Sequence, residues 1–183
     1  MHTRKPVLLI VSEPWSLERA VEEVGDTLYV LDENIEIEVI APTLALAYSR
    51  MIAPWRAIGE LMRNPPAYAR RIVPIESIVN ANVDDVVRTV VKVIRTRGVN
   101  LEAKYNIEIH KHGFNVNQGE MERIRRRIEE TLGVPDKRKK PRWSILLDFI
   151  SNTRLVVSVT PYKLDRVSYW RRLKWPHVFK ERL

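Results

Sequence analysis

The stretch KYNIEIHKHGFNVNQGEMERIRRRIEETLG, residues Lys104–Gly133, carries the strongest structural pattern in the sequence. From Tyr105 to Ile109 it alternates apolar and polar residues, which is typical of a half-buried β-strand. Asn117 and Glu120 then have the spacing of a helix capping box. The stretch therefore predicts a strand, a loop and a helix, and the apolar face of that helix is formed by Met121, Ile124, Ile128 and Leu132.

The segments on either side extend this pattern into one folded unit. The opening Ile75–Arg97 is expected to be rich in helix, with Asn82 as the cap of its second helical stretch. The nearly all-apolar segment Trp143–Ile150 predicts a central strand, and a hairpin joins it to a second strand at Arg154–Thr160. The predicted order of elements in this half is ααβαββ.

The first half of the chain shows a different order, βαββαβ, which is the ferredoxin-like order. Ser16 is the expected N-cap of the first helix, and Pro54 suits the start of the second. The fold class is therefore expected to be α/β of the α+β type. The four strands of this half are predicted at Val7–Ser12, Ile35–Ile40, Leu44–Met51 and Tyr68–Ile75.

The net charge changes sign along the chain. Residues 1–66 hold 6 Lys and Arg against 10 Asp and Glu, whereas residues 67–183 hold 25 against 13. An excess of this size on one side predicts binding to a polyanion, and a surface of mixed salt bridges explains it less well. We expect three parts: residues 1–73, residues 74–161 and a basic aromatic tail at residues 162–183.

The composition excludes several classes of site. The sequence has no cysteine, so disulfides, zinc–thiolate clusters and thiol nucleophiles are excluded. Its six glycines are scattered, so it has no glycine-rich phosphate-binding loop. We expect no catalytic residues, no cofactor and no metal. With no targeting segment and no apolar run long enough to span a bilayer, a cytoplasmic protein without membrane contact is expected.

The candidate RNA-binding residues are basic residues that gather in four places. These are the junction between the halves, the strand that follows Lys104, the predicted helix and the loop DKRKKPR. For the helix arginines, pairing with Glu122, Glu129 and Glu130 is an equally good explanation. The candidates are Arg70, Arg71, Lys104, His110, Lys111, His112, Arg123, Arg126, Arg127, Lys137, Arg138, Lys139, Lys140 and Arg142.

Two features leave alternatives open. His110 and His112 fall on one face of a strand and could hold a metal ion, but no third ligand stands close by in the sequence. In the tail, aromatic residues alternate with cations, so they could stack on unpaired bases or anchor the tail to the core. These aromatic residues are Tyr162, Tyr169, Trp170, Trp175 and Phe179.

The second half resembles a THUMP domain, the RNA-binding module of thiouridine synthases, RNA methylases and pseudouridine synthases. The resemblance covers about Pro74–Pro161, and it rests on the pattern of residue types in Ile75–Arg97, in Lys104–Gly133 and in KKPRWSILLDFISNTRLVVSV. Pro141 matches the proline that precedes the second strand in the family. Arg142 stands where the family commonly has an acid, which is a departure.

This resemblance implies a function. In the family, a ferredoxin-like domain commonly precedes the THUMP module, and the pair grips the acceptor stem and 3′ end of tRNA while a separate domain performs the chemistry. Only about 22 residues follow the THUMP-like part, so no catalytic domain is expected. The chain is similar to stand-alone THUMP proteins that assist tRNA cytidine acetylation. The resemblance thus implies a tRNA-binding adaptor for tRNA processing, with a separate modifying enzyme, an acetyltransferase, as its partner.

Two other functions remain open on the sequence alone. The first is a small RNA-modifying enzyme without a cofactor, for which His110, His112 and Asp148 are the best candidates. The second is a scaffold whose basic surface binds an acidic protein.

Overall fold

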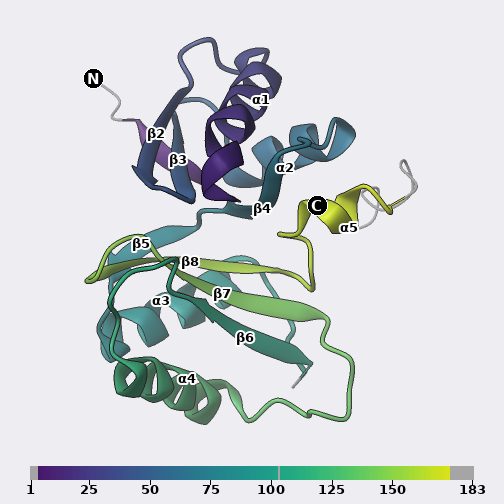
Figure 1. The fold of residues 1–183 in the computed structure, drawn as a ribbon. Helices are drawn as coiled ribbons and strands as arrows, with labels where there is room; N and C mark the ends of the chain where they lie inside the picture. The colour runs from purple at the N-terminus through teal and green to yellow at the C-terminus, as the bar shows by residue number, and fades with distance from the viewer. Residues whose placement is uncertain (1–3, 103, 174–183) are drawn as a thin grey trace. The chain divides into compact units, whose positions relative to one another are not determined.

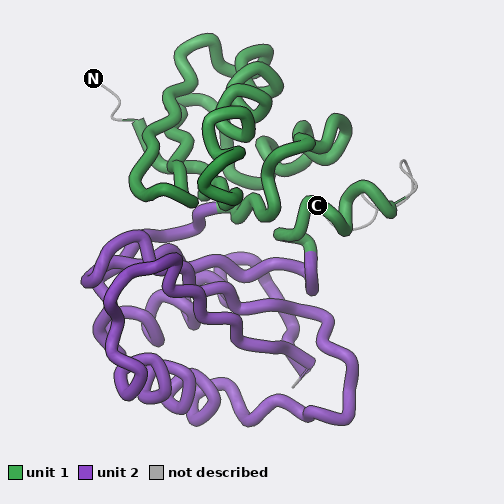
Figure 2. Tube along the Cα trace, in the orientation of Figure 1, with its two compact units in different colours: residues 1–74, 164–183 green, residues 75–163 purple. Residues whose placement is uncertain are grey.

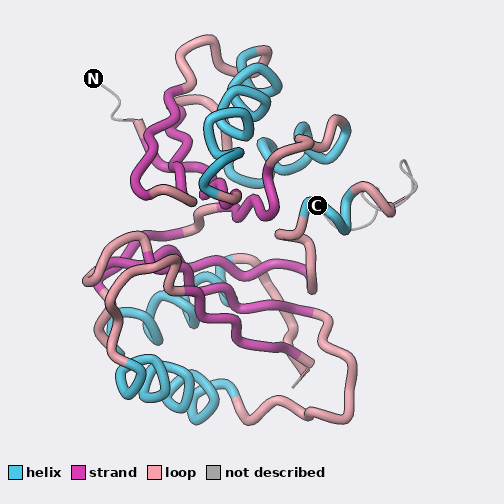
Figure 3. Tube along the Cα trace, in the orientation of Figure 1, coloured by secondary structure: helices cyan, strands magenta, loops and turns pink. Residues whose placement is uncertain are grey.

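The computed structural model describes residues 4–102 and 104–173, and within them the chain forms two four-stranded sheets and five α-helices (Figure 1). These elements divide into two compact units (Figure 2). Unit 1 consists of the described residues of Met1–Pro74 and of Leu164–Leu183, and unit 2 is Ile75–Lys163. Helices and strands alternate along both units, which confirms the predicted α+β class (Figure 3).

Unit 1 has the predicted βαββαβ order, and its sheet has the strand order β2-β3-β1-β4 with every pair antiparallel. The expected strand at Leu44–Met51 is confirmed as the inner strand β3. The six elements are β1 (Lys5–Ser12), α1 (Leu17–Tyr29), β2 (Glu36–Ala41), β3 (Leu44–Ser49), α2 (Pro54–Arg63) and β4 (Ala69–Pro74).

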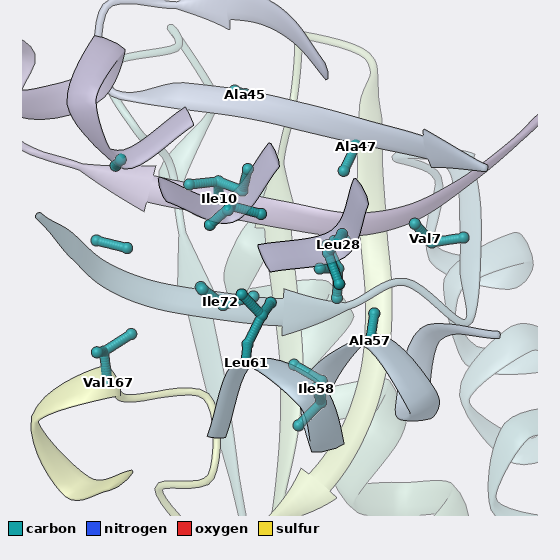
Figure 4. Close-up of a cluster of buried hydrophobic side chains, with 14 of the residues drawn as sticks. Val7, Ile10, Leu28, Ala45, Ala47, Ala57, Ile58, Leu61, Ile72 and Val167 are labelled. Atoms are coloured by element: carbon teal, nitrogen blue, oxygen red, sulfur yellow. The ribbon is translucent and has the colours of Figure 1, made fainter. Parts of the chain in front are cut away.

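The core of unit 1 lies between one face of this sheet and its helices (Figure 4). Ala45 and Ala47 of β3 leave room for α1 to pack closely, and both alanines are fully buried. The short helix α5 (Val167–Trp170) completes this core, because Val167 and Trp170 are buried in the same cluster as the strands and helices of residues 4–74. Residues 164–173 are therefore part of unit 1. Trp175 and Phe179 lie outside the described residues.

Unit 2 has the strand order β5-β8-β7-β6. β6 and β7 are parallel, and α4 forms the crossover between them, whereas the other pairs are antiparallel. The central position of β7 and the hairpin to β8 are confirmed. The elements are β5 (Ser77–Asn80), α3 (Val83–Thr96), β6 (Tyr105–His110), α4 (Gln118–Leu132), β7 (Trp143–Phe149) and β8 (Arg154–Pro161).

The first element of unit 2 is a strand, so the prediction of a helix before Asn82 was wrong and the observed order is βαβαββ. Only seven residues separate Pro74 from Asn82, and the Asn82 side chain already caps α3 by accepting a hydrogen bond from the Asp85 amide at 2.9 Å. This leaves too little chain for a helix. The β-branched residues Ile78 and Val79 instead pair with the edge of β8.

The two faces of the second sheet differ in chemistry. One face packs against α3 and α4 through a single apolar cluster that includes Ile124, Ile145 and Val157. On the other face, most of the residues that β6 and β7 contribute are polar, among them Glu108 and Asp148. Within residues 4–102 and 104–173, no helix combines the length and the apolar character that a membrane span requires.

Candidate nucleic-acid interface

The structure separates the predicted basic residues of unit 2 into three groups around β6. Lys104 and Arg142 lie where β6 and β7 begin, and the His110–His112 run lies where β6 ends. Six strand residues span on the order of 17–20 Å, so the two ends of β6 cannot contact the same phosphate. The arginines of α4 form the third group, on the crossover helix.

The first group, which we call the basic end, combines Lys104, the loop residues 137–140 and Arg142. The Arg142 amide donates a hydrogen bond to the Lys104 carbonyl at 2.7 Å, which fixes the end of the loop against the start of β6. The four cations of the loop and Arg142 are exposed, and Lys104 is half-buried beside Glu102. The basic end therefore gathers six cations on the loop and at the start of β6 and β7: Lys104, Lys137, Arg138, Lys139, Lys140 and Arg142.

Asp136 is the acid that faces these cations within the loop. Its side chain accepts a hydrogen bond from the Arg138 amide at 3.0 Å, and this bond, followed by the contact with Lys139, lowers its pKa. Lys139 and Arg138 lie 3.5 and 3.6 Å from the carboxylate. For Lys137, Lys140 and Arg142, no ion pair is found in the part of the chain that the structure describes. Asp136 therefore shapes the turn and leaves the loop strongly positive.

The arginines of α4 are engaged by acids and carbonyls on their own unit. Arg126 and Arg127 both pair with Glu130, at 2.9 and 3.3 Å, and these pairs lower the pKa of Glu130. Arg123 donates to the Gly119 carbonyl at 3.4 Å. These bonds agree with the alternative that the sequence left open for the helix arginines. Such exposed pairs are weak, so the side chains can still exchange partners.

The far end of β6 holds its basic residues in a compact cluster. His112 lies 2.7 Å from the fully buried carboxylate of Asp148, and its ring centre is 5.8 Å from that of His110. His110 lies 3.6 Å from Glu108, and Lys111 donates to the Val116 carbonyl at 3.1 Å. These contacts hold the loop after β6 onto the sheet, so this group presents less free charge than the basic end.

Arg70 and Arg71, the two candidates in unit 1, point to different surroundings. Arg70 is exposed and pairs with Glu13. The Arg71 side chain is only 13% exposed and its Nε lies 2.5 Å from the buried carboxylate of Asp165. Arg71 therefore has a structural contact inside unit 1 and presents little surface to a ligand.

Two further residues belong to the basic end and were not among the candidates. The Tyr162 amide donates to the Arg142 carbonyl at 2.8 Å, and the Lys163 ammonium lies 5.1 Å from the centre of the Tyr162 ring. The antiparallel pairing of Trp143 with Pro161 brings them there. The hairpin predicted from the sequence already implied this neighbourhood, but residues 162 and 163 had been assigned to the tail.

A metal ion in a protein is usually held by several His, Asp or Glu side chains that converge on one point. In the described ranges, no group of three or more of them is arranged to do so. His110 and His112 are close to each other, and the His112 ring is hydrogen-bonded to Asp148 while the two imidazole rings are tilted against each other.

The sequence matches no family model and no curated protein. The fold, however, is similar to parts of several solved structures. PH1313 from Pyrococcus horikoshii is similar with a TM-score of 0.63 and 13% identity, over 86% of this chain and 55% of that one. TrmN from Thermus thermophilus is similar with a TM-score of 0.53 and 18% identity, over 85% of this chain and 45% of that one.

A third similar structure is a 4-thiouridine synthetase in complex with RNA and with bound ATP. Its TM-score is 0.52 and its identity 8%, over 86% of this chain and 42% of that one. The chain thus spans about half the length of the structures that it resembles. At these identities the likeness establishes a shared fold: the α+β fold of this chain also occurs within larger proteins, among them one solved together with RNA.

Proposed function

We propose that this protein binds RNA through unit 2 and that its natural ligand is the acceptor stem and 3′ end of tRNA. The observation that carries the proposal is the basic end, where six cations lie on or beside an exposed loop and the acids next to them are Asp136 and Glu102. The resemblance to THUMP domains and the fold shared with a 4-thiouridine synthetase–RNA complex support RNA over other polyanions.

The basic end suits a phosphate backbone for electrostatic reasons. Lys and Arg that neutralise phosphates release the counterions condensed on the RNA, so the affinity falls steeply as salt is added. The loop also ends at Arg142, whose planar guanidinium binds phosphate through two parallel hydrogen bonds. RNA bound in this way is recognised by its backbone, and specificity for the end of the molecule requires contacts to unpaired nucleotides.

The first test removes two loop charges that lack an acidic partner in the described structure. The double change Lys137→Gln and Lys140→Gln is expected to weaken tRNA binding severalfold and to reduce the slope of log affinity against log salt by about 2. Filter binding or fluorescence anisotropy at several salt concentrations measures both quantities.

Arg88→Gln is the matched control, because Arg88 is 76% exposed on α3 of the same unit and lies 3.6 Å from Asp85. It should leave the salt slope within error of the parent. If the double variant keeps the slope of the parent, the basic end is not the RNA contact.

Recognition of the 3′ end has a separate test. The affinity for an intact tRNA is compared with that for the same tRNA without its 3′ single strand, and we expect the shortened RNA to bind less tightly. Equal affinities would exclude end recognition and leave general RNA binding. Absence of any salt-dependent RNA binding would favour the scaffold, whose basic surface binds an acidic protein.

We further infer that the protein acts as an adaptor, which presents tRNA to a separate modifying enzyme, an acetyltransferase. The second candidate function is a small RNA-modifying enzyme, and the 2.7 Å contact between His112 and Asp148 is the observation in its favour. Incubating the purified protein with tRNA and analysing the nucleosides by mass spectrometry separates the two. A nucleoside modified by this protein alone would overturn the adaptor.

A further inference from the structure

A second site lies in unit 1, whereas the basic end lies in unit 2. It is a hollow of about 420 Å³ at the turn between β1 and α1, next to β4 and α5. A volume of this size is within the range of small-ligand sites in proteins. Its lining is aromatic and charged, and it includes Glu13, Trp15, Tyr68, Arg70, Ser168 and Arg171.

Trp15 is the unusual residue of this hollow, because its side chain is 79% exposed. Tryptophan exposes a large apolar surface at this position although it sits on a fixed part of the fold. It belongs to the single 3₁₀ turn Pro14–Ser16, and the Ser16 hydroxyl is hydrogen-bonded to that of Ser12 at 2.7 Å. Pro14 restricts the backbone further. The ring is therefore displayed from a backbone that is already ordered.

The other aromatic ring of the hollow is also held in position. The Tyr68 hydroxyl accepts a hydrogen bond from Arg19 at 3.0 Å, and its amide donates to the Glu23 carboxylate at 3.0 Å. Arg171 of the segment after α5 donates to the Ala67 carbonyl at 2.9 Å and to the Pro66 carbonyl. Segments that are about 100 residues apart in the sequence thus form one ordered wall.

Two arginines line the hollow together with these aromatic rings. Arg70 is 67% exposed and pairs with Glu13 at the edge of the hollow, and Arg171 is exposed as well. An exposed ion pair of this kind is weak, so an incoming phosphate can take the guanidinium from the carboxylate at little cost. Glu13 is then left as a hydrogen-bond acceptor, because a carboxylate has several acceptor positions.

We propose that this hollow binds one unpaired nucleotide of an RNA ligand, with the base stacked on Trp15 and its phosphate held by Arg70 and Arg171. Stacking on an aromatic ring combined with a basic residue for the backbone is how proteins hold single-stranded nucleic acid. The Glu13 carboxylate accepts a hydrogen bond from an exocyclic amino group, so adenine or cytosine binds better than uracil. This inference rests on the RNA-binding function proposed above and adds a second contact, for an unpaired base.

The test uses the full chain and short single-stranded RNA as the probe. Tetraadenylate is titrated into the protein, and binding is followed by fluorescence anisotropy of a labelled probe. Trp15→Ala is expected to weaken binding at least fivefold, which is the lower end of the loss of one stacked base, whereas Trp15→Phe retains most of the affinity. Tetrauridylate should bind the parent protein more weakly than tetraadenylate.

Two control variants lie in the same unit and outside the hollow. Met51→Ala removes an apolar side chain that is 74% exposed, and it should leave binding unchanged. Arg70→Gln should weaken the binding of tetraadenylate, whereas Arg63→Gln should not, since Arg63 is a comparably exposed arginine paired with Glu60 at 2.9 Å. Circular dichroism of each variant checks that unit 1 remains folded.

The outcome is separable from the test of the basic end. If Trp15→Ala binds tetraadenylate as tightly as the parent does, the hollow is not a nucleotide site, even where the basic end still governs tRNA binding. A hollow that binds a peptide instead would give the same result. In the other outcome, Trp15→Ala loses its affinity for tetraadenylate and keeps the parent's slope of log affinity against log salt for tRNA that lacks its 3′ single strand. In that case the two contacts are independent and the proposal stands.

Discussion

At the scale of single residues, Tyr105 links the start of β6 to the end of α4. It is 2% exposed, and its hydroxyl donates a hydrogen bond to the Gly133 carbonyl. Burial, together with the nearby Glu129 carboxylate, raises the pKa of Tyr105 to about 12. In the unfolded chain the phenol ionises near pH 10, so the folded state favours the neutral phenol.

This pKa predicts how the stability of unit 2 depends on pH. Tyr105 makes its full contribution to the free energy of unfolding below about pH 10. As the pH rises towards 12, this contribution is lost and the free energy of unfolding falls by about 2–3 kcal/mol. Tyr105→Phe should lower the free energy of unfolding by about 1 kcal/mol at pH 7, because its hydrogen bond is lost. The variant should also lack the fall in stability at alkaline pH that the ionisation of Tyr105 causes. Urea unfolding at pH 7 and pH 11 measures both effects. Tyr29→Phe, at an exposed position, should follow the parent curve.

Single-residue predictions from the sequence succeeded where one local rule decides the outcome. Asn82 caps α3 as its position indicated. Ser16 does sit before α1, but its hydroxyl bonds to Ser12 instead of capping the helix. This contact depends on the fold of the preceding turn, which no local pattern reports. The pairing of His112 with Asp148 is of the same kind, since β6 and β7 must first lie side by side.

At the scale of elements, the segment that leads into α5 is joined to β4 by a buried ion pair. The Asp165 carboxylate is fully buried beside Arg71, and the Asp165 carbonyl accepts a hydrogen bond from the Ile72 amide at 2.8 Å. The sequence offered Arg71 as an RNA contact because it forms a basic pair with Arg70 at the junction between the two halves. The partner lies 94 positions further along the chain, so neither local charge nor spacing could indicate it.

Asp165→Asn tests the strength of this link. Loss of one partner leaves a charge without compensation in a buried site, so we expect the free energy of unfolding of unit 1 to fall by about 3–5 kcal/mol. Glu130→Gln is the control, because Glu130 also pairs with arginines but on the exposed face of α4, and it should lower the free energy of unfolding far less than Asp165→Asn does. Equal losses in the two variants would show that the Arg71 pair is no stronger than a surface pair.

The elements themselves were largely predictable, and β5 marks the limit. Alternation, short apolar runs and helical spacing identified the other seven strands and the four long helices. β5 has only four residues, and it is a strand because β8 offers a free edge to Ile78 and Val79. Short segments take their structure from tertiary neighbours, and this dependence is invisible in the local pattern.

At the scale of the whole molecule, unit 1 is built from two segments that are separated by the whole of unit 2. Trp170 is 2% exposed and belongs to the core formed by residues 4–74. The sequence left open whether the region after Pro161 docks on the body of the protein. The apolar anchors Leu164, Val167 and Trp170 answer this for the described part of that region.

Trp170→Ala is expected to lower the stability of unit 1 by about 3–5 kcal/mol, because it removes a large buried side chain. Hydrogen exchange resolved by segment is the suitable measurement. Amides of β1 and β4 should lose protection, while those of β7 and β8 keep it. Tyr169→Ala, at a neighbouring position that is 37% exposed, should have a much smaller effect. Uniform loss of protection in both units would mean that they unfold as one.

The divided construction of unit 1 also sets the order of events during protein synthesis. β1 to β4 leave the ribosome first, yet Val167 and Trp170 follow only after all 89 residues of Ile75–Lys163 have been made. At ordinary translation rates this interval is roughly 5–20 s. During that time Arg71 has no Asp165 beside it, and the surface that receives Trp170 is uncovered. The core of unit 1 can therefore be completed only after unit 2 has been synthesised.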